Sequence, residues 1–297
     1  MTVHHDLPGQ ADREMGEPLA IICGGGTLPF SVADAVIRAG RRVVLFPLYG
    51  WADPAAVMRY PHHWIYVGQF GRLRRLAQRE GCREMVLIGT LVRPSLRQIR
   101  LDYETIRAMP QVLRAFRGGD DHLLSAVGRI IESYGFRLVG AHEVAPEILV
   151  LPGVFGRRTP SERDRRDIER ALAVLAATAP FDVGQAAVVA EGYVLALEAA
   201  EGTDAMLDRV ANLRRAGRIR SAAGIGVLVK APKGGQDRRF DLPTVGPATV
   251  EGVARAGLAG LAVVAGGAII AEPARVAELA DAAGVFVAGV EPGGCPR

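Results

Sequence analysis

Short apolar segments, each followed by glycine or by a segment with helical spacing, recur along the first half of this sequence. Leu19–Cys23 leads into Gly24–Gly26 and then into Leu28–Ala39, whose apolar residues recur with helical periodicity. Arg42–Phe46 and Met85–Ile88 are two further apolar runs. Continuous runs of this length are typical of strands that a parallel sheet buries on both faces. Their alternation with helices predicts a doubly wound α/β domain.

The rest of the chain extends this pattern into two domains. The first domain gains strands at Trp64–Val67 and Phe136–Val139 and helices at Arg72–Glu80, Thr105–Phe116 and Asp121–Tyr134. The second half predicts another α/β unit, with strands at Ala186–Ala190, Tyr193–Leu197, Val227–Lys230, Leu261–Val264 and Val285–Ala288 and helices at Thr203–Leu213 and Val250–Ala256. Between them, Gly153–Arg170 holds six Arg and four acidic residues. The capping-box pattern of Ser161 and Asp164 predicts a helix that starts near Arg163.

These features give four expected segments. Residues 1–18 form a flexible lead-in, residues 19–151 an N-terminal Rossmann-like α/β domain, residues 152–162 a linker, and residues 163–297 a C-terminal α/β domain that carries the chemistry.

The composition excludes several classes of protein. With 49% hydrophobic and 23% charged residues among 297, the chain is too apolar to be disordered. The net charge of +4 is mild, and without a nucleic-acid-binding motif we expect no nucleic-acid partner. The cysteines Cys23, Cys82 and Cys295 form no Cys-x-x-Cys pair, which favours a reducing compartment. Without a signal peptide or an apolar run of roughly 18 residues, we expect a cytoplasmic protein that can touch a membrane surface peripherally.

The glycine-rich segment after the first strand is a candidate phosphate-binding loop. Gly25, Gly26, Thr27 and Leu28 stand between a strand and a helix, where bare backbone N–H groups and a helix N-terminus favour an anion. Dinucleotide binding is disfavoured, because Pro29 replaces the third fingerprint glycine and no carboxylate follows Arg42–Phe46. The alternative is a tight turn that binds nothing.

Other polar candidates for ligand binding lie at strand ends or helix starts: Gly89, Thr90, Asp120, Glu143, Gln185, Glu191, Thr203 and Asp204. Asp120 is equally explained as a helix cap, Glu143 as a structural residue and Thr203 as an N-cap. Glu191 is harder to explain structurally. It interrupts two apolar runs, and a carboxylate near a core needs a metal, an arginine or a ligand as partner.

The densest polar stretch is Val227–Gly246, in which a buried strand ends at Lys230 and a charged loop follows. The loop contains Lys233, Gln236, Asp237, Arg238, Arg239 and Asp241. Cations beside carboxylates at a strand end suit phosphoryl chemistry, because Lys and Arg hold phosphate oxygens while Asp holds Mg²⁺ or orients water. The alternative is a solvated charged loop.

Taken together, these motifs resemble those of the LpxI-type UDP-2,3-diacylglucosamine pyrophosphatases. The resemblance rests on five segments in order, which are IICGGGTLPF at 21–30, GDD at 119–121, GAHEV at 140–144, the segment from DVGQ to DAML at 182–207 and LVKAPKGGQDRRFDLPTVG at 228–246. It covers about residues 19–290.

The resemblance implies cleavage of UDP-2,3-diacylglucosamine into UMP and 2,3-diacylglucosamine 1-phosphate (lipid X), a step of lipid A synthesis. It implies a divalent cation, Mg²⁺ or Mn²⁺, two domains with the ligand between them, and a homodimer that can contact the inner membrane. The family's essential aspartate falls on Asp241. We expect Asp241 and Asp237 to hold the metal, and Lys230 and Arg239 to take up charge on the leaving phosphate.

Two other functions are open from the residues. A non-catalytic module that binds a nucleotide-sugar or a lipid would not require the charged loop. A nicotinamide oxidoreductase is disfavoured by Pro29 and by the missing ribose carboxylate.

Overall fold

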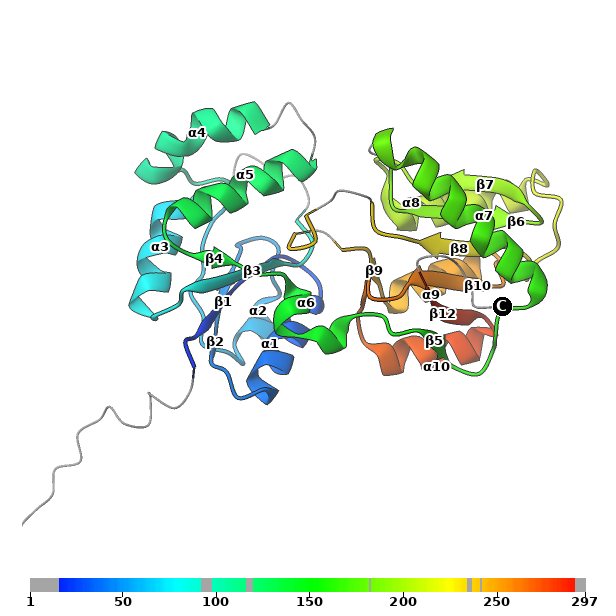
Figure 1. Ribbon diagram of the computed structural model, residues 1–297, viewed down its shortest axis with the longest axis horizontal. Coiled ribbons are helices and arrows are strands. Elements are labelled where there is room, and N and C mark those ends of the chain that lie inside the picture. Colours follow the sequence, from blue (N-terminus) through cyan, green and yellow to red (C-terminus); the bar gives the residue numbers. More distant parts are fainter. Residues whose placement is uncertain are drawn as a thin grey trace, which may run out of the picture. The chain divides into compact units, whose positions relative to one another are not determined.

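The structure is a computed structural model that describes residues 16–91, 98–115, 120–181, 183–233, 237–240 and 242–291, with the backbone alone for 111–115 and 120–123. The chain divides into two compact units (Figure 1). The N-terminal unit holds the chain up to Pro146 together with Asp237–Phe240, and the C-terminal unit holds the rest from Glu147. The predicted two-domain α/β class is confirmed.

The N-terminal unit is built on a parallel sheet of four strands in the order β2-β1-β3-β4. Its strands are β1 Leu19–Cys23, β2 Val43–Pro47, β3 Glu84–Ile88 and β4 Arg137–Leu138. Its helices are α1 Leu28–Arg38, α2 Pro54–Val57, α3 Phe70–Arg79, α4 Tyr103–Ala115, α5 Asp120–Ser133 and α6 Ala141–Val144. In the register, Leu19 of the central β1 stands opposite Val43 on one side and Glu84 on the other.

Helices cover both faces of this sheet, which explains why its strands are continuously apolar. Leu73 of α3 and Ile131 of α5 pack in one core cluster with Phe46 of β2. Alternate strand residues point to the opposite face, where α1 packs on β1 and β2. The predicted strand at Trp64–Val67 is not among the named strands, since its residues make only isolated bridges, such as Ile65 with Leu48.

The C-terminal unit is built on a mixed sheet of six strands in the order β5-β12-β10-β8-β6-β7. Its strands are β5 Gly153–Phe155, β6 Ala186–Ala190, β7 Tyr193–Leu197, β8 Val227–Lys230, β10 Gly260–Val264 and β12 Phe286–Val290. A separate small sheet pairs β9 Thr244–Val245 with β11 Ile269–Ile270. Its helices are α7 Glu162–Thr178, α8 Gly202–Arg215, α9 Pro247–Arg255 and α10 Pro273–Ala283, with 3-10 turns at Pro146–Ile148 and Ala179–Phe181.

This unit has three layers. Ile168 and Leu175 of α7 pack on one face of the sheet, against Val229 of β8. On the other face, Met206 of α8 belongs to a core cluster that also takes in α9, α10 and Leu228 of β8. Because both faces are buried, the central strands again read as unbroken apolar runs.

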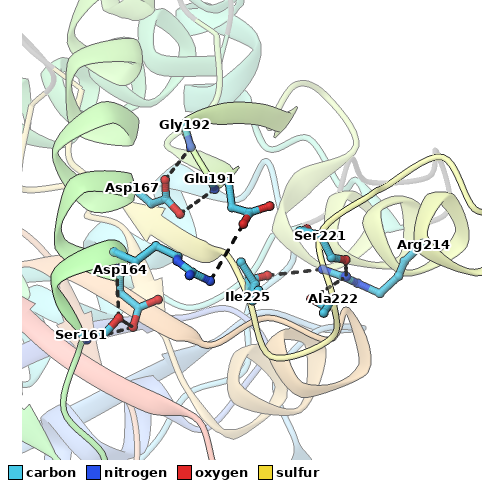
Figure 2. Close-up of polar contacts among 10 residues, drawn as sticks. Ser161, Asp164, Asp167, Glu191, Gly192, Arg214, Ser221, Ala222 and Ile225 are labelled. Atoms are coloured by element: carbon cyan, nitrogen blue, oxygen red, sulfur yellow. Dashed lines mark hydrogen bonds and ion pairs between the residues drawn. The ribbon is translucent and has the colours of Figure 1, made fainter.

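The segment between the units differs from the predicted linker at 152–162. Gly153–Phe155 forms β5, which pairs antiparallel with β12. Because β5 lies at the edge of the sheet, it needs backbone hydrogen bonds to one neighbouring strand only, and a short segment can make them. Ser161 caps α7, as the capping-box pattern predicted, with its hydroxyl accepting from the Asp164 N–H (Figure 2). Farther along, the Arg214 guanidinium donates to the carbonyls of Ser221 and Ala222, which fixes the loop before β8 (Figure 2).

Candidate functional site

The glycine-rich loop after β1 is paired with the loop after β3. The Gly25 N–H donates to the Thr90 carbonyl at 2.8 Å, and the Thr90 N–H donates back to the Gly25 carbonyl at 2.9 Å. These two N–H groups therefore hold the loops together and are not the free donors of the predicted phosphate cradle. Gly26 and Thr27 are exposed at the start of α1, and Leu28 is its first residue.

Close approach of these two loops explains the glycines at 24 and 89. A Cβ on Gly24 would lie 2.6 Å from the Thr90 carbonyl oxygen. Gly89 has a φ of +104°, and its Cβ would lie 2.8 Å from the Gly25 oxygen. A side chain at either position would push apart the carboxyl ends of β1 and β3. At these two positions the sequence pattern reflects a packing requirement.

The charged loop after β8 contributes Asp237–Phe240 to the N-terminal unit. There the Arg239 guanidinium pairs with Asp237 at 2.7 Å and with Glu132 of α5 at 2.7 Å. Both Asp237 oxygens accept from Arg239, which lowers the pKa of the Asp237 carboxyl. The same hydrogen bonds, chiefly those to Asp237, raise the pKa of Arg239.

The predicted roles of Arg239 at the leaving phosphate and of Asp237 as a metal ligand stay predictions. Arg239 forms ion pairs with two carboxylates, which fixes its position beside α5. Both Asp237 oxygens accept from Arg239, and carboxylate oxygens can accept more than one partner each. Among the described residues, no group of three or more His, Cys, Asp or Glu side chains is placed to hold a metal ion.

Phe240 anchors the same segment by packing. It joins the core cluster formed by α3, α5 and the sheet. A Cβ on Gly128 of α5 would lie 2.4 Å from the Phe240 ring, so this glycine leaves the room that the ring occupies. Asp237–Phe240 is thus fixed to the N-terminal unit by an ion-pair network and by an aromatic side chain.

Lys230 lies at the carboxyl end of β8 and is 8% exposed. Its ammonium group donates to the Thr244 carbonyl of β9 at 2.9 Å. The burial and this hydrogen bond hold the Lys230 side chain in place at the end of the strand, and its predicted catalytic role stays a prediction.

Two of the other predicted residues meet beside this strand end. The Ala231 N–H donates to the Gln185 carbonyl, and the Gln185 N–H donates to Glu198 Oε2 at 2.8 Å. The Thr203 hydroxyl donates to Glu198 Oε1 at 2.8 Å. Sequence analysis missed Glu198, although a carboxylate that directly follows the apolar strand Tyr193–Leu197 was a signal that could have found it.

The structure places Glu191 in a two-residue hairpin turn between β6 and β7, not at a buried site. Glu191 and Gly192 have φ values of +52° and +78°. Asp167 of α7, 2% exposed, accepts from the Glu191 N–H at 2.9 Å and from the Gly192 N–H at 2.7 Å (Figure 2). The Glu191 carboxylate is half-exposed and lies 3.9 Å from Arg163. Of the partners expected for this carboxylate, the structure supplies an arginine, and only the expected position near a core was wrong, because the turn directs the side chain outward.

The structure also places four further candidates, none of them deeply buried. Glu143 Oε1 accepts from the Gly140 N–H at 2.6 Å and so caps the short helix α6. Thr203 is not the N-cap of α8, a position that Glu201 occupies, and Asp204 is exposed in the first turn of that helix. Lys233 is half-buried. Gln236, Asp241 and the side chain of Asp120 lie outside the described part of the chain.

The two units define a two-domain α/β protein, in which Lys230 lies at a strand end of the C-terminal unit and Arg239 pairs with carboxylates in the N-terminal unit. Sequence profiles agree in detail. The profile of the LpxI N-terminal domain matches residues 18–148, and that of the LpxI C-terminal domain matches residues 151–288. The chain is 42% identical to the UDP-2,3-diacylglucosamine pyrophosphatase LpxI of Caulobacter vibrioides, over 92% of this chain and 98% of that protein. The chain belongs to the LpxI family.

Proposed function

We propose that this protein hydrolyses UDP-2,3-diacylglucosamine, giving UMP and 2,3-diacylglucosamine 1-phosphate for lipid A synthesis. The observation that carries the proposal is the match to the Caulobacter pyrophosphatase along 98% of that protein, with both family domains present. In the reaction, water attacks one phosphorus, the bridging P–O bond breaks, and each product leaves with one phosphate.

Within this proposal, Asp241 is the essential carboxylate. The buried Lys230 supplies positive charge at the end of β8, where developing negative charge on a phosphate oxygen would be stabilised. Arg239 holds its segment to α5, and its predicted role at the leaving phosphate is part of the proposal. Gly26, Thr27, Gln185 and Thr203 remain candidates for contacts with the rest of the substrate.

The cofactor and the setting are part of the proposal. We propose a requirement for Mg²⁺, with Mn²⁺ as the alternative ion, and a homodimer that meets its lipid substrate at the inner membrane surface from the cytoplasmic side. In the part of the chain that the structure describes, no helix combines the length and apolar character needed to cross a membrane. Contact with the membrane would then be peripheral.

The test is UMP release from UDP-2,3-diacylglucosamine, with and without EDTA. Release that EDTA abolishes and added Mg²⁺ restores supports the hydrolase and its metal, whereas release unaffected by EDTA refutes the metal requirement alone. Binding without turnover would indicate a binding module.

Substitution tests the assignment of the carboxylate. Asp241→Ala should abolish hydrolysis and leave the fold intact. Asp208→Asn is the matched control, because Asp208 is an exposed carboxylate on α8 paired with Arg255. Near-normal activity of Asp241→Ala would remove the catalytic assignment. Hydrolysis in oxygen-18 water identifies the attacked phosphorus, since only one product carries the label.

A further inference from the structure

An aromatic stack lies just beyond the carboxyl end of β2. The Tyr49 ring lies 4.3 Å from the Tyr66 ring, at an interplanar angle of 25°, and 4.9 Å from the Trp64 ring. Trp64 and Tyr66 are alternate residues of an extended segment, whose Ile65 bridges Leu48, so their rings point to the same side. Tyr49 therefore packs against both rings.

The stack continues through Tyr66 to a cation. The Arg100 guanidinium carbon lies 4.0 Å from the centre of the Tyr66 ring. The Arg100 guanidinium and the Tyr49 ring both lie within 4.3 Å of the Tyr66 centroid, so they cannot occupy the same face of the Tyr66 ring. The Tyr66 ring therefore lies between them. Tyr49 keeps 39% of its surface exposed. Part of Tyr49 is thus open to solvent, while its ring is held in place by Trp64 and Tyr66.

The stack adjoins the glycine-rich loop. The Leu48 N–H donates to the Cys23 carbonyl at 3.0 Å, which joins the end of β2 to the end of β1. The Trp51 carbonyl oxygen lies 3.3 Å from the position that a Cβ on Gly25 would take. Ligands of parallel α/β sheets bind outside the carboxyl ends of the strands, and the stack stands at this edge.

We propose that Tyr49 is the stacking platform for the pyrimidine base of the nucleotide, an inference that rests on the proposed hydrolysis of a UDP-linked substrate. Every nucleobase has a flat π-face, and an aromatic ring that is already immobilised loses little freedom when a base stacks on it. Arg100 behind Tyr66 orients the column by a cation–π contact. The exposed Gly26 and Thr27 lie on the same sheet edge, where the attached phosphate would extend.

The test measures binding of UMP, ribose 5-phosphate and inorganic phosphate by calorimetry, and the quenching of Trp64 fluorescence in a Trp51→Phe background. UMP should bind at least about tenfold more tightly than ribose 5-phosphate, and it alone should quench Trp64. Tyr49→Ala should weaken UMP binding about tenfold or more and leave ribose 5-phosphate binding unchanged. Tyr49→Phe should retain UMP binding, because the ring and not the hydroxyl makes the contact.

Tyr103→Ala is the control, since Tyr103 is 78% exposed at the start of α4 and lies outside the stack. Equal binding of UMP and ribose 5-phosphate, or an unchanged affinity of Tyr49→Ala for UMP, would overturn the base site. An effect of Tyr49→Ala on the lipid substrate but not on UMP would also overturn it, by assigning Tyr49 to the acyl chains. Base-dependent binding of UMP without any UMP release from the substrate would refute the hydrolysis and leave the base site standing.

Discussion

Replacing Glu191 by Asn separates the two explanations of this residue, substrate contact and hairpin turn. Two-residue hairpins with positive φ at both positions favour Asn-Gly, and residue 192 is already Gly. A residue other than Gly, Asn or Asp in the left-handed region costs about 1 kcal/mol, which Asn largely avoids. The half-exposed ion pair with Arg163 contributes about 0–0.5 kcal/mol. Glu191→Asn should therefore stabilise the C-terminal unit by about 0.5–1 kcal/mol.

The assay combines calorimetry with UMP release. For a unit of this size, the expected gain corresponds to an increase in Tm of about 1–4 °C, with unchanged kcat and KM. Asp167→Ala is the opposite perturbation, because it removes the acceptor of two turn N–H groups. Hydrogen bonds to a charged group contribute about 1.5–3 kcal/mol each, so this variant should lose about 3 kcal/mol or more. A Glu191→Asn variant of normal stability that has lost most of its activity would refute the turn interpretation.

Three further predictions concern the N-terminal unit. Phe240→Ala should destabilise it by about 2 kcal/mol in urea unfolding, because a partly buried aromatic is lost, and Gly128→Ala should act likewise by displacing the ring; an effect of neither would contradict the packing. Because Arg239 lowers the pKa of Asp237, their pairing stabilises the folded protein above the ordinary carboxyl pKa of about 4, and this stabilisation is lost as the pH falls through the lower pKa of the folded state. Asp237→Asn should therefore reduce the loss of stability in acid. An unchanged profile of stability against pH would argue against the pair. Burial raises the pKa of the Cys23 thiol to about 12, so iodoacetamide at pH 8 should leave it unlabelled in the folded protein, as mass spectrometry can check.

Most strands of both sheets could be predicted because burial on two faces leaves a strong local signal, whereas the exposed edge strand β5 was missed. Leu19–Cys23 and Val227–Lys230 are fully buried and contain almost no polar side chain. Trp64–Val67 consists of aromatic and β-branched residues, which also favour strands, yet it makes only single bridges. Composition reports the preference for an extended backbone, whereas strand pairing depends on which neighbours the fold supplies.

The candidate site was less predictable, because its key contacts join residues that are far apart in the sequence. Arg239 pairs with Glu132 at a separation of 107 residues, and nothing near either residue indicates the other. Glu191 misled for a different reason. A carboxylate between two apolar runs suggests burial, but a two-residue turn reverses the chain there and leaves the side chain outside. Gly24 and Gly89 follow strands where the sequence predicted, but their close backbone approach could not be predicted, because it depends on the neighbouring strand.

The return of Asp237–Phe240 to the N-terminal unit has a consequence for how the protein folds during synthesis. The ribosome adds Pro146 long before it adds Phe240. During that interval α5 lacks the Phe240 ring that packs beside Gly128 in the complete protein. At about 5–20 residues per second, the wait lasts roughly 5–20 s. A nascent chain halted before residue 237 therefore exposes apolar surface that the complete chain covers, and it is a natural target for chaperones. An N-terminal fragment that ends at the boundary between the two family domains lacks Asp237–Phe240 altogether, so it keeps the same apolar surface exposed.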